Sequence, residues 1–569
     1  MYRRTSTPGG AQTSVEDDGQ QQMGRIPTTG APNSVYTAQH STPRQHTTGL
    51  TQQRAAWEIV FITIAVLILT FWIYVELPVR KIKKLTCHIP GPKLIPGSGL
   101  LIALYKIFNE GPGILKYFMQ IIAQYGPVIR LSHVGRVTIV LTDVEDIEVV
   151  LRDAEMIYKP PIMRRLIKPW LGNGLLFSEG SYWKQQRKSI TPTFHFNILE
   201  KFFEVFNEQG DILVEMLKEK ADGKTNLDIS SFMKSYALDV ICETAMGSKM
   251  HSQTKLVQND YVSAVYEIQR IFIDRLCKPL EQIDFIFPFT RNGRIQRKCL
   301  KVLNDKCDEI IRQRRKDLVE ATTNLTKMKH EDVGTKKRLA FLDLLLHATN
   351  LDGTPLTNEQ IRDEVASFTF AGHDTTSTQL SLFYYILSKH PDIQEEIYKE
   401  QCAIFMGENH EPTFKDVQEM QYLERTIKES QRLCTVVPFL SRQTHKDITL
   451  KTNGYVVPKG TMVVLFLTSL HRNPNIFPNP EKFDPDRFLP ENIRKRNPFA
   501  FIPFGAGPRN CIGQKYAMLQ MKTTTSKIIR NFKILPGYEE NGTLYEPDFK
   551  AYIVLVAING IKIRLVPRK

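Results

Sequence analysis

Near its C-terminus the chain holds the segment FGAGPRNCIG, residues 504–513, followed by the helix-compatible run QKYAMLQMK. The glycines let the backbone approach a bulky planar ligand closely. A cysteine that opens a helix has its thiolate stabilised by the N-terminus of that helix. The segment therefore predicts that Cys511 binds a metal as a thiolate. For any single cysteine, the alternative is a structural thiol buried in the core.

Other cofactor motifs do not fit this part of the sequence. Gln514 and Lys515 follow Gly513, so the phosphate-binding Walker pattern is absent, and no CxxCH segment is present. The eight cysteines form no CxxC pair and no framework of the kind that small secreted domains use. A reducing, cytosol-facing catalytic domain is the simpler interpretation.

The chain is basic, with a formal net charge of +15 that is spread along the sequence instead of lying in one block. This distribution favours an anionic membrane surface or an acidic partner. No helix-turn-helix or zinc-finger spacing supports base-reading, so we expect no nucleic-acid partner.

The N-terminal part divides into three segments before the catalytic domain. Residues 1–54 are rich in threonine and glutamine and poor in aliphatic side chains, which predicts a disordered tail. Residues 55–77 predict a single transmembrane anchor, because AAWEIVFITIAVLILTFWIYV is apolar all round and would reach about 31 Å as a helix. Residues 78–99 predict a basic, Pro/Gly-rich linker, whose charges place the catalytic domain, residues 100–569, in the cytosol.

Most of the catalytic domain has helical periodicity. A capping box of Thr357 and Gln360 predicts the start of a long helix, and Pro391 predicts its end. In the middle of this helix, AGHDTT at residues 371–376 places a glycine and a polar run between apolar stretches, as is expected at a functional site. A kinked, partly buried helix without such a role is the alternative.

Three further segments carry predictions about secondary structure. PVIRL and VTIVL around Gly135-Arg136 predict a hairpin, and so do the two β-rich runs around Asn559-Gly560. The polar, charged stretch near residues 311–338 predicts an exposed connection.

Over about residues 88–569, the order of these segments resembles the cytochrome P-450 superfamily. FGAGPRNCIG matches the pattern F-x-x-G-x-R-x-C-x-G, and AGHDTT matches the family's oxygen-binding helix. The resemblance implies a mainly α fold, with a large helical domain around a long central helix and a small β-rich domain. It also implies that Cys511 is the axial thiolate ligand of haem iron, that Arg509 binds a haem propionate and that Phe504 lies near the sulfur.

The same resemblance assigns roles on the central helix. Thr375 would hydrogen-bond bound oxygen, Asp374 would help to relay protons, and Ala371 and Gly372 would lie beside the haem, with Gly372 leaving space for it. His373 is interpreted as a core or partner-contact histidine and not as a metal ligand.

Residues in other segments resemble the family's haem-binding and structural positions. Trp183 and Arg187 in WKQQR, together with Arg442 after Pro438, resemble residues that reach the haem propionates. A second set resembles the buried structural cluster of one glutamate and two arginines: Glu429, Arg432 and Arg487.

Three segments look most like the fourth family of the superfamily, known chiefly for fatty-acid omega-hydroxylation: EVASFTFAGHDTT, DVICETAMG and HRNPNIFPNPEKFDPDRF. Several members of that family carry a glutamate, linked covalently to the haem, where this chain has Ala371. The departure predicts noncovalent haem b and puts strict terminal regioselectivity in doubt.

The activity implied is that of a monooxygenase that hydroxylates an apolar substrate, such as a fatty acid or related lipid, with molecular oxygen. NADPH would supply electrons indirectly through a flavoprotein reductase, with cytochrome b5 as a further partner, at the endoplasmic reticulum membrane. Basic residues predict the docking face: Lys184, Arg187, Lys188, Arg494, Lys495, Arg496 and Lys515. Two alternatives remain, a haem-thiolate isomerase or dehydratase that needs no reductase and a non-catalytic haem-binding sensor.

Overall fold

The computed structural model describes residues 47–92, 113–133, 135–254, 260–327, 340–350, 352–407 and 410–568. The chain divides into two compact units, Met1–Phe71 and Trp72–Lys569. Of the predicted segments, residues 1–46 of the tail and 93–99 of the linker lie outside the described residues.

The first described element is helix α1, Thr47–Leu85, which contains the predicted anchor. The helix begins before the predicted end of the tail and continues through Pro78 into the predicted linker. An ion pair between Glu76 and Lys83, 2.6 Å apart, supports the helix beyond the proline. Within the described part of the chain, no helix combines the length and the apolar character that a membrane crossing needs, so the predicted span is not confirmed.

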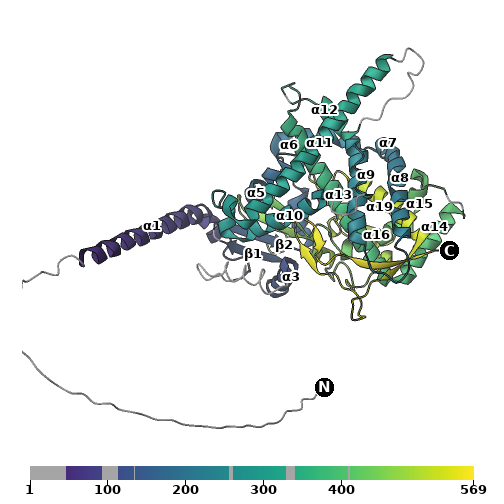
Figure 1. The fold of residues 1–569 in the computed structure, drawn as a ribbon. Coiled ribbons are helices and arrows are strands. Elements are labelled where there is room, and N and C mark those ends of the chain that lie inside the picture. The colour runs from purple at the N-terminus through teal and green to yellow at the C-terminus, as the bar shows by residue number, and fades with distance from the viewer. Residues whose placement is uncertain are drawn as a thin grey trace, which may run out of the picture. The chain divides into compact units, whose positions relative to one another are not determined.

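The second unit is mainly helical, as predicted, with small sheets at one side (Figure 1). Before the long helix α13, the helices are α3 Gly113–Tyr125, α4 Val144–Arg152, α5 Pro161–Leu171, α6 Gly180–Ile190, α7 Phe196–Leu199, α8 Phe203–Lys218, α9 Ile229–Met246, α10 Asp260–Cys277, α11 Arg291–Lys327 and α12 Phe341–His347. After it come α14 Pro391–Phe405, α15 Phe414–Glu419, α16 Gln421–Leu433, α17 Leu467–His471, α18 Pro490–Arg494 and α19 Gln514–Asn531. Short 3₁₀ helices are η1 Thr191–Phe194, η2 Glu200–Phe202, η3 Pro279–Gln282, η4 Phe287–Phe289, η5 Pro485–Phe488 and η6 Pro498–Ala500.

The largest sheet has the strand order β1-β2-β7-β4, formed by Val128–His133, Arg136–Leu141, Met462–Phe466 and Phe439–Gln443. Strands β1 and β2 pair antiparallel with His133 opposite Arg136, which confirms the first predicted hairpin. Strand β7 pairs parallel to β2, so segments more than 300 residues apart in sequence share one sheet. The smaller sheets are β3-β11-β8 (Leu227–Asp228, Lys562–Pro567, Phe532–Pro536), β10-β9 (Leu555–Ala557, Phe549–Ala551) and β5-β6 (Ile448–Thr449, Val456–Val457).

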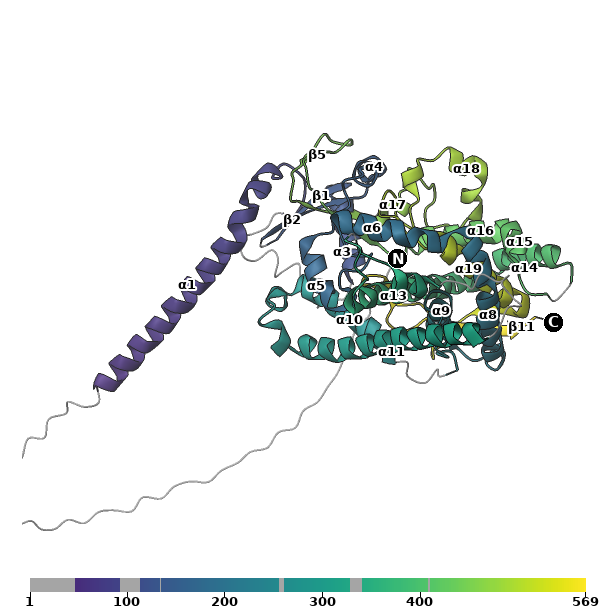
Figure 2. The same cartoon turned by 90° about the horizontal axis from the view of Figure 1, so that it is seen from above.

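Helix α13, Asn358–Lys389, lies inside the helical part beside α9 and α11 (Figure 2). The predicted capping box starts it: Thr357 Oγ1 accepts from the Gln360 N–H at 3.2 Å, and Gln360 Oε1 accepts from the Thr357 N–H at 2.8 Å. The helix ends just before Pro391, as predicted. It is buried on nearly all sides and therefore forms the centre of the main hydrophobic core.

Two secondary-structure predictions were wrong. Residues 311–327 are not a connection but the end of α11, because Ile311 is buried and Arg314 forms an ion pair with Asp343 at 2.6 Å; residues 328–338 lie outside the described part. Asn559-Gly560 forms a turn but no hairpin, since β10 pairs with β9 while β11 pairs with β8 and β3. The side chain of Asp228 accepts from the Ile561 N–H at 2.8 Å, which directs the chain after the turn into another sheet.

Candidate active site

Cys511 lies on a tight loop three residues before α19. Its N–H donates to the carbonyl of Phe504, the first residue of the predicted motif, at 2.8 Å. This hydrogen bond closes the loop between Phe504 and Cys511. Gly505 and Gly507 have φ of 69° and 70°, a region that favours glycine. A Cβ at Gly507 would lie 1.9 Å from the carbonyl oxygen of Leu151. The close approach that this glycine permits is therefore one between the loop and α4.

The surroundings of the Cys511 sulfur act on its ionisation in two directions. Part of the side chain is open, but burial among neighbouring groups raises the pKa of the thiol. The N–H of Gly513 and the positive charge of Arg187 oppose that effect. Arg187 is fixed beside the sulfur because it donates to the carbonyl and the side-chain oxygen of Asn510, at 2.9 and 2.8 Å. The loop therefore presents a sulfur whose negative charge the protein partly stabilises.

Four cations gather at this loop: Arg509 belongs to the loop, and three others come from separate segments, Lys159, Arg187 and Arg442. Burial lowers the pKa of Arg442 to about 10, and burial together with Arg442 lowers that of Arg509 to about 9. Burial, with the charges of Arg442 and Arg509, also lowers the pKa of Lys159. Because these cations are buried or partly buried and repel one another, the cluster favours an anionic partner.

The polar contacts of the cluster are mostly with uncharged groups. Arg509 donates to the carbonyls of Ile157, Leu175 and Ser178, at 3.0 and 3.2 Å for the first two, and lies 4.2 Å from the centroid of the buried Trp183 ring. Arg442 on β4 donates to the carbonyl of Ser441. The nearby carboxylate of Glu179 already accepts from Arg164 and from the backbone of Lys159. The cluster would suit the two propionate groups of a haem that the Cys511 sulfur would hold.

Helix α13 holds the second group of predicted residues. Asp374 is buried, and its Oδ2 accepts from the Gln269 side chain of α10 at 2.9 Å. Thr375 Oγ1 donates to the carbonyl of Ala371 at 2.8 Å, one turn earlier. The helix is continuous through this glycine and polar run, as the predicted single long helix requires. An acid and an alcohol thus stand side by side on a rigid element.

The structure shows a role for Gly372 that differs from the expected one, which was to leave space for the haem. A Cβ at this position would lie 2.5 Å from Ile241 Cγ1 on α9. The missing side chain allows α9 and α13 to pack closely, and the space beside Gly372 is filled by protein. His373 is fully buried, with its ring 5.9 Å from that of Tyr261, in keeping with its interpretation as a core residue.

The structure also brings Glu429, Arg432 and Arg487 together. Arg432 donates to both carboxylate oxygens of Glu429, at 2.7 and 2.8 Å, and both residues are fully buried. Arg487 Nε lies 3.3 Å from Glu429 Oε1. Arg432 also donates to the carbonyl of His471, so the cluster ties α16 to the segment that follows β7.

Two residues of the site were missed from the sequence. Lys159 lies between a tyrosine and a proline, and no local pattern marks it as part of the cation cluster. Gln269 could have been found, because it is a polar residue on the buried face of α10, between Ile268 and Phe272. Its one-turn neighbours on that face are apolar, so a buried amide there indicates a polar partner on another element.

A single thiolate on a glycine-rich loop, a buried cation cluster and a long helix with an acid-alcohol pair define a protein of the haem-thiolate class. Comparison with known proteins agrees. The family model described as Cytochrome P450 matches residues 89–560. The chain belongs to the cytochrome P450 family, so its cofactor is haem with a thiolate ligand, a reductase supplies its electrons, and it is a monooxygenase.

Several curated relatives are similar over most of their length. Cytochrome P450 4c21 of Blattella germanica is 41% identical, over 79% of this chain and 88% of its own. Cytochrome P450 4d2 of Drosophila melanogaster is 39% identical, over 84% of this chain and 94% of its own. Cytochrome P450 4V2 of Homo sapiens is 38% identical, over 80% of this chain and 86% of its own. These names agree with the predicted resemblance to the fourth family.

The fold is also that of a solved structure. The crystal structure of the cytochrome P450DA heme domain superposes with a TM-score of 0.70, at 24% identity, over 84% of this chain and 98% of that one. This similarity supports the fold alone.

Proposed function

We propose that this monooxygenase hydroxylates a fatty acid or a related lipid. The observation that carries the oxygen-activating part of the proposal is the buried Asp374 next to Thr375 on α13. Oxygen activation uses an acid and an alcohol, whereas an isomerase or a haem sensor does not need them. The resemblance of the central motifs to the fourth family supports the substrate class.

Each residue of the site then has a role. Cys511 is the thiolate ligand, and Lys159, Arg187, Arg442 and Arg509 hold the propionate groups, with Trp183 packed against Arg509. The haem supplies the activation of molecular oxygen when it is bound. Ala371 provides no carboxylate for a covalent link, so the haem is bound noncovalently.

On α13, the chain's own residues hold and move protons. Thr375 presents a hydroxyl whose hydrogen bond to Ala371 can be exchanged for one to the reacting oxygen. Asp374 holds and passes protons, because a carboxylate can accept a proton from water and release it again. The apolar core around Phe370 and Trp170, whose ring centroids are 4.5 Å apart, excludes water from neighbouring space.

Surface charge supports a reductase as the partner, and exposed apolar side chains support a location at the membrane. Exposed Lys184 and Lys188 on α6 and Lys515 on α19 lie on the elements that hold the Cys511 loop, and they suit an acidic face of the reductase. Arg496 is held by contacts within the protein, since it donates to the Arg487 carbonyl and lies 4.5 Å from the Phe477 ring. Large apolar side chains of α1, such as Trp57 and Phe61, are exposed and suit attachment to the endoplasmic reticulum membrane.

The test is the carbon monoxide difference spectrum of the reduced, detergent-solubilised protein. We expect the red-shifted Soret band of thiolate-ligated haem in the wild type and its loss in Cys511→Ala. The exposed Cys402 provides the control, because Cys402→Ala should leave the band unchanged. A wild type that shows the band and oxidises dodecanoic acid with NADPH and reductase supports the proposal. Haem binding without turnover of any fatty acid would contradict the substrate class.

Membrane attachment has a separate test. Alkaline carbonate extraction of microsomes should leave the chain in the pellet, and deletion of residues 47–71 should release it. The exposed Asn541, in the sequon Asn-Gly-Thr, should carry no glycan if the catalytic domain faces the cytosol. A glycan at Asn541 would contradict this orientation.

A further inference from the structure

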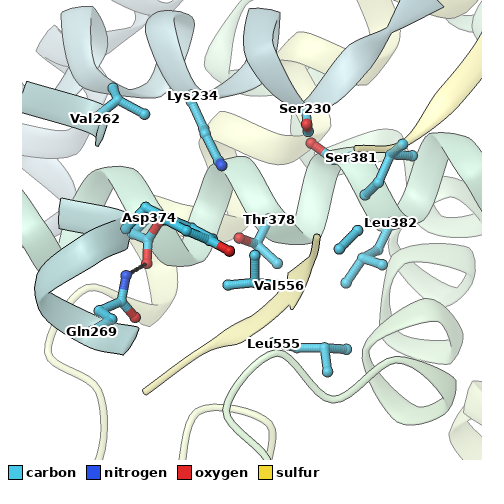
Figure 3. Close-up of a pocket in the computed structure, with 13 residues that line it drawn as sticks. Ser230, Lys234, Val262, Gln269, Asp374, Thr378, Ser381, Leu382, Leu555 and Val556 are labelled. Atoms are coloured by element: carbon cyan, nitrogen blue, oxygen red, sulfur yellow. Dashed lines mark hydrogen bonds between the residues drawn. The ribbon is translucent and has the colours of Figure 1, made fainter. Parts of the chain in front are cut away.

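Helix α13 carries buried acidic side chains at two places along its length. Near its middle, Asp374 lines a pocket of about 490 Å³, including its open mouth, and accepts from the Gln269 side chain at 2.9 Å (Figure 3). This place belongs to the site described above. About 15 Å earlier along the helix, Asp363 and Glu364 accept instead from the backbone of the loop 172–179, which joins α5 to α6.

The two carboxyl groups hold this loop through its N–H groups. Asp363 Oδ2 accepts from the Asn173 N–H at 2.7 Å, and Glu364 Oε2 accepts from the Leu175 N–H at 3.0 Å. Glu364 and Leu175 are both buried, whereas Asn173 is exposed. A buried N–H that loses its acceptor is strongly disfavoured. Glu364 is therefore the stronger of the two constraints on the loop.

The loop also needs glycine where it meets α13. Gly172 has a φ of 51°, and a Cβ there would lie 1.9 Å from Asp363 Oδ1. A Cβ at Gly174 would lie 2.3 Å from Ser367 Oγ and 2.5 Å from the carbonyl oxygen of Asp363. The backbone of the loop thus lies directly against the helix, and α13 sets its position.

The carbonyl groups of the same loop hold Arg509. Its guanidinium donates to the carbonyl of Leu175 at 3.2 Å and to the carbonyl of Ser178. Leu175 therefore connects two groups, because its N–H is bound by Glu364 of α13 and its carbonyl binds Arg509 beside Cys511. A shift of the loop would move two of the acceptors that orient the guanidinium.

We propose that Glu364, assisted by Asp363, is a positioning residue for the haem, because it holds the loop whose carbonyls orient Arg509. The inference rests on the proposed function, since it requires Arg509 to hold a propionate group. A guanidinium binds a carboxylate best through two parallel N–H groups, so its orientation matters as well as its charge. The start of α13 thus acts on haem binding through the loop 172–179, without touching the haem itself.

Transfer of haem from the ferric, full-length holoprotein to an excess of apomyoglobin tests this role. Glu364→Ala removes the acceptor of the Leu175 N–H and should speed haem release roughly tenfold. Glu364→Gln should remain within about twofold of the wild type, because burial raises the pKa of Glu364 to about 8 and an amide resembles the uncharged carboxyl. Asp363→Ala acts at the more exposed end of the loop, should speed release roughly two- to threefold, and carries the test if Glu364→Ala does not fold.

Asp239→Ala is the matched control for the loss of a buried acceptor. This buried carboxylate on α9 accepts from the N–H groups of Ser252 and Gln253, at 2.7 and 2.9 Å, and so holds the segment that follows α9. The control should lower the temperature of thermal unfolding as Glu364→Ala does, but it should leave haem release within about twofold of the wild type. A similar acceleration of haem release in the control would overturn the positioning role.

Arg509→Lys separates positioning from a general loosening of the fold. Lysine keeps the charge but not the planar fork that the loop carbonyls orient. This variant should therefore release haem faster, and Glu364→Ala should add less than about twofold to it. Equal acceleration by Glu364→Ala in both backgrounds, or none in the wild-type background, would overturn the inference and leave the proposed function intact. If Arg509→Lys does not change haem release, the proposed propionate role of Arg509 fails, and the inference fails with it.

Discussion

At the scale of single residues, the site and the structural cluster are built mainly from buried or partly buried charged side chains. Sequence motifs predicted the positions of Cys511, Arg509 and the Glu429 cluster because each stands in a short, dense pattern. They did not predict Lys159 or Gln269, which reach the site from isolated positions on other segments. Such residues depend on tertiary packing, and a single sequence carries little local information about it.

Arg432→Met should destabilise the fold by about 3–5 kcal/mol, because it leaves the fully buried Glu429 without its main partner. The remaining contact with Arg487 is longer, at 3.3 Å. Chemical unfolding measures the loss. Arg152→Met is the control, since Arg152 pairs with Glu148 while 71% exposed, and it should cost no more than about 1 kcal/mol. Equal losses in the two variants would contradict the structural role of the cluster.

At the scale of elements, helices and the first hairpin followed their local patterns, whereas pairing between distant strands did not. The start of α13 could be predicted because its capping box is local. The turn at Asn559-Gly560 was recognised, but the partners of the strands beside it are set by Asp228 and by β8, which the turn cannot specify. The end of α11 was missed because its few apolar and ion-paired contacts are dispersed among charged residues.

The close packing of α9 on α13 predicts the effect of Gly372→Ala. Alanine favours a helix by about 1 kcal/mol over glycine, but its Cβ would lie 2.5 Å from Ile241. We expect the overpacking to win, with a net loss of roughly 1–2 kcal/mol in the free energy of unfolding. Ile241→Ala in the same chain should remove the clash, so a double-mutant cycle should show a favourable coupling energy. Simple additivity would contradict the contact.

Glu364 on α13 predicts a pH dependence of stability. Burial raises the pKa of its carboxyl from the usual 4.5 to about 8, although it accepts from the Leu175 N–H at 3.0 Å. Between these two values the folded state binds more protons than the unfolded state. Stability is therefore greatest at low pH within this window and falls as the pH rises, by up to about 1.4 kcal/mol per unit.

Thermal unfolding at several pH values tests this effect. Glu364→Gln keeps an acceptor for the Leu175 N–H but cannot ionise, so its stability should change less between pH 5 and pH 8, about the window of the shift. An equal slope in wild type and variant would show that other groups cause the dependence.

At the scale of the whole molecule, the excess of positive charge can bind an acidic partner only where the fold places several basic side chains close together. Lys184→Glu, Lys188→Glu and Lys515→Glu combined should raise the apparent KM for reductase about tenfold at low salt, with a smaller difference at high salt. The same reversal on α11, at exposed Arg294, Lys298 and Lys301, is the control and should have little effect. If both triple variants behave alike, the docking face is wrong.

The Cys511 loop has a consequence for when the cofactor can be acquired during biosynthesis. Arg187 and Asn510 are 323 residues apart in sequence, and Arg509 and Ile157 are 352 apart. Such contacts cannot form until the ribosome has released almost the entire chain, which takes roughly half a minute to two minutes at ordinary elongation rates. The nascent protein must therefore remain soluble without its haem for that time. Haem supply in the cell would then limit maturation of the finished chain and not its translation.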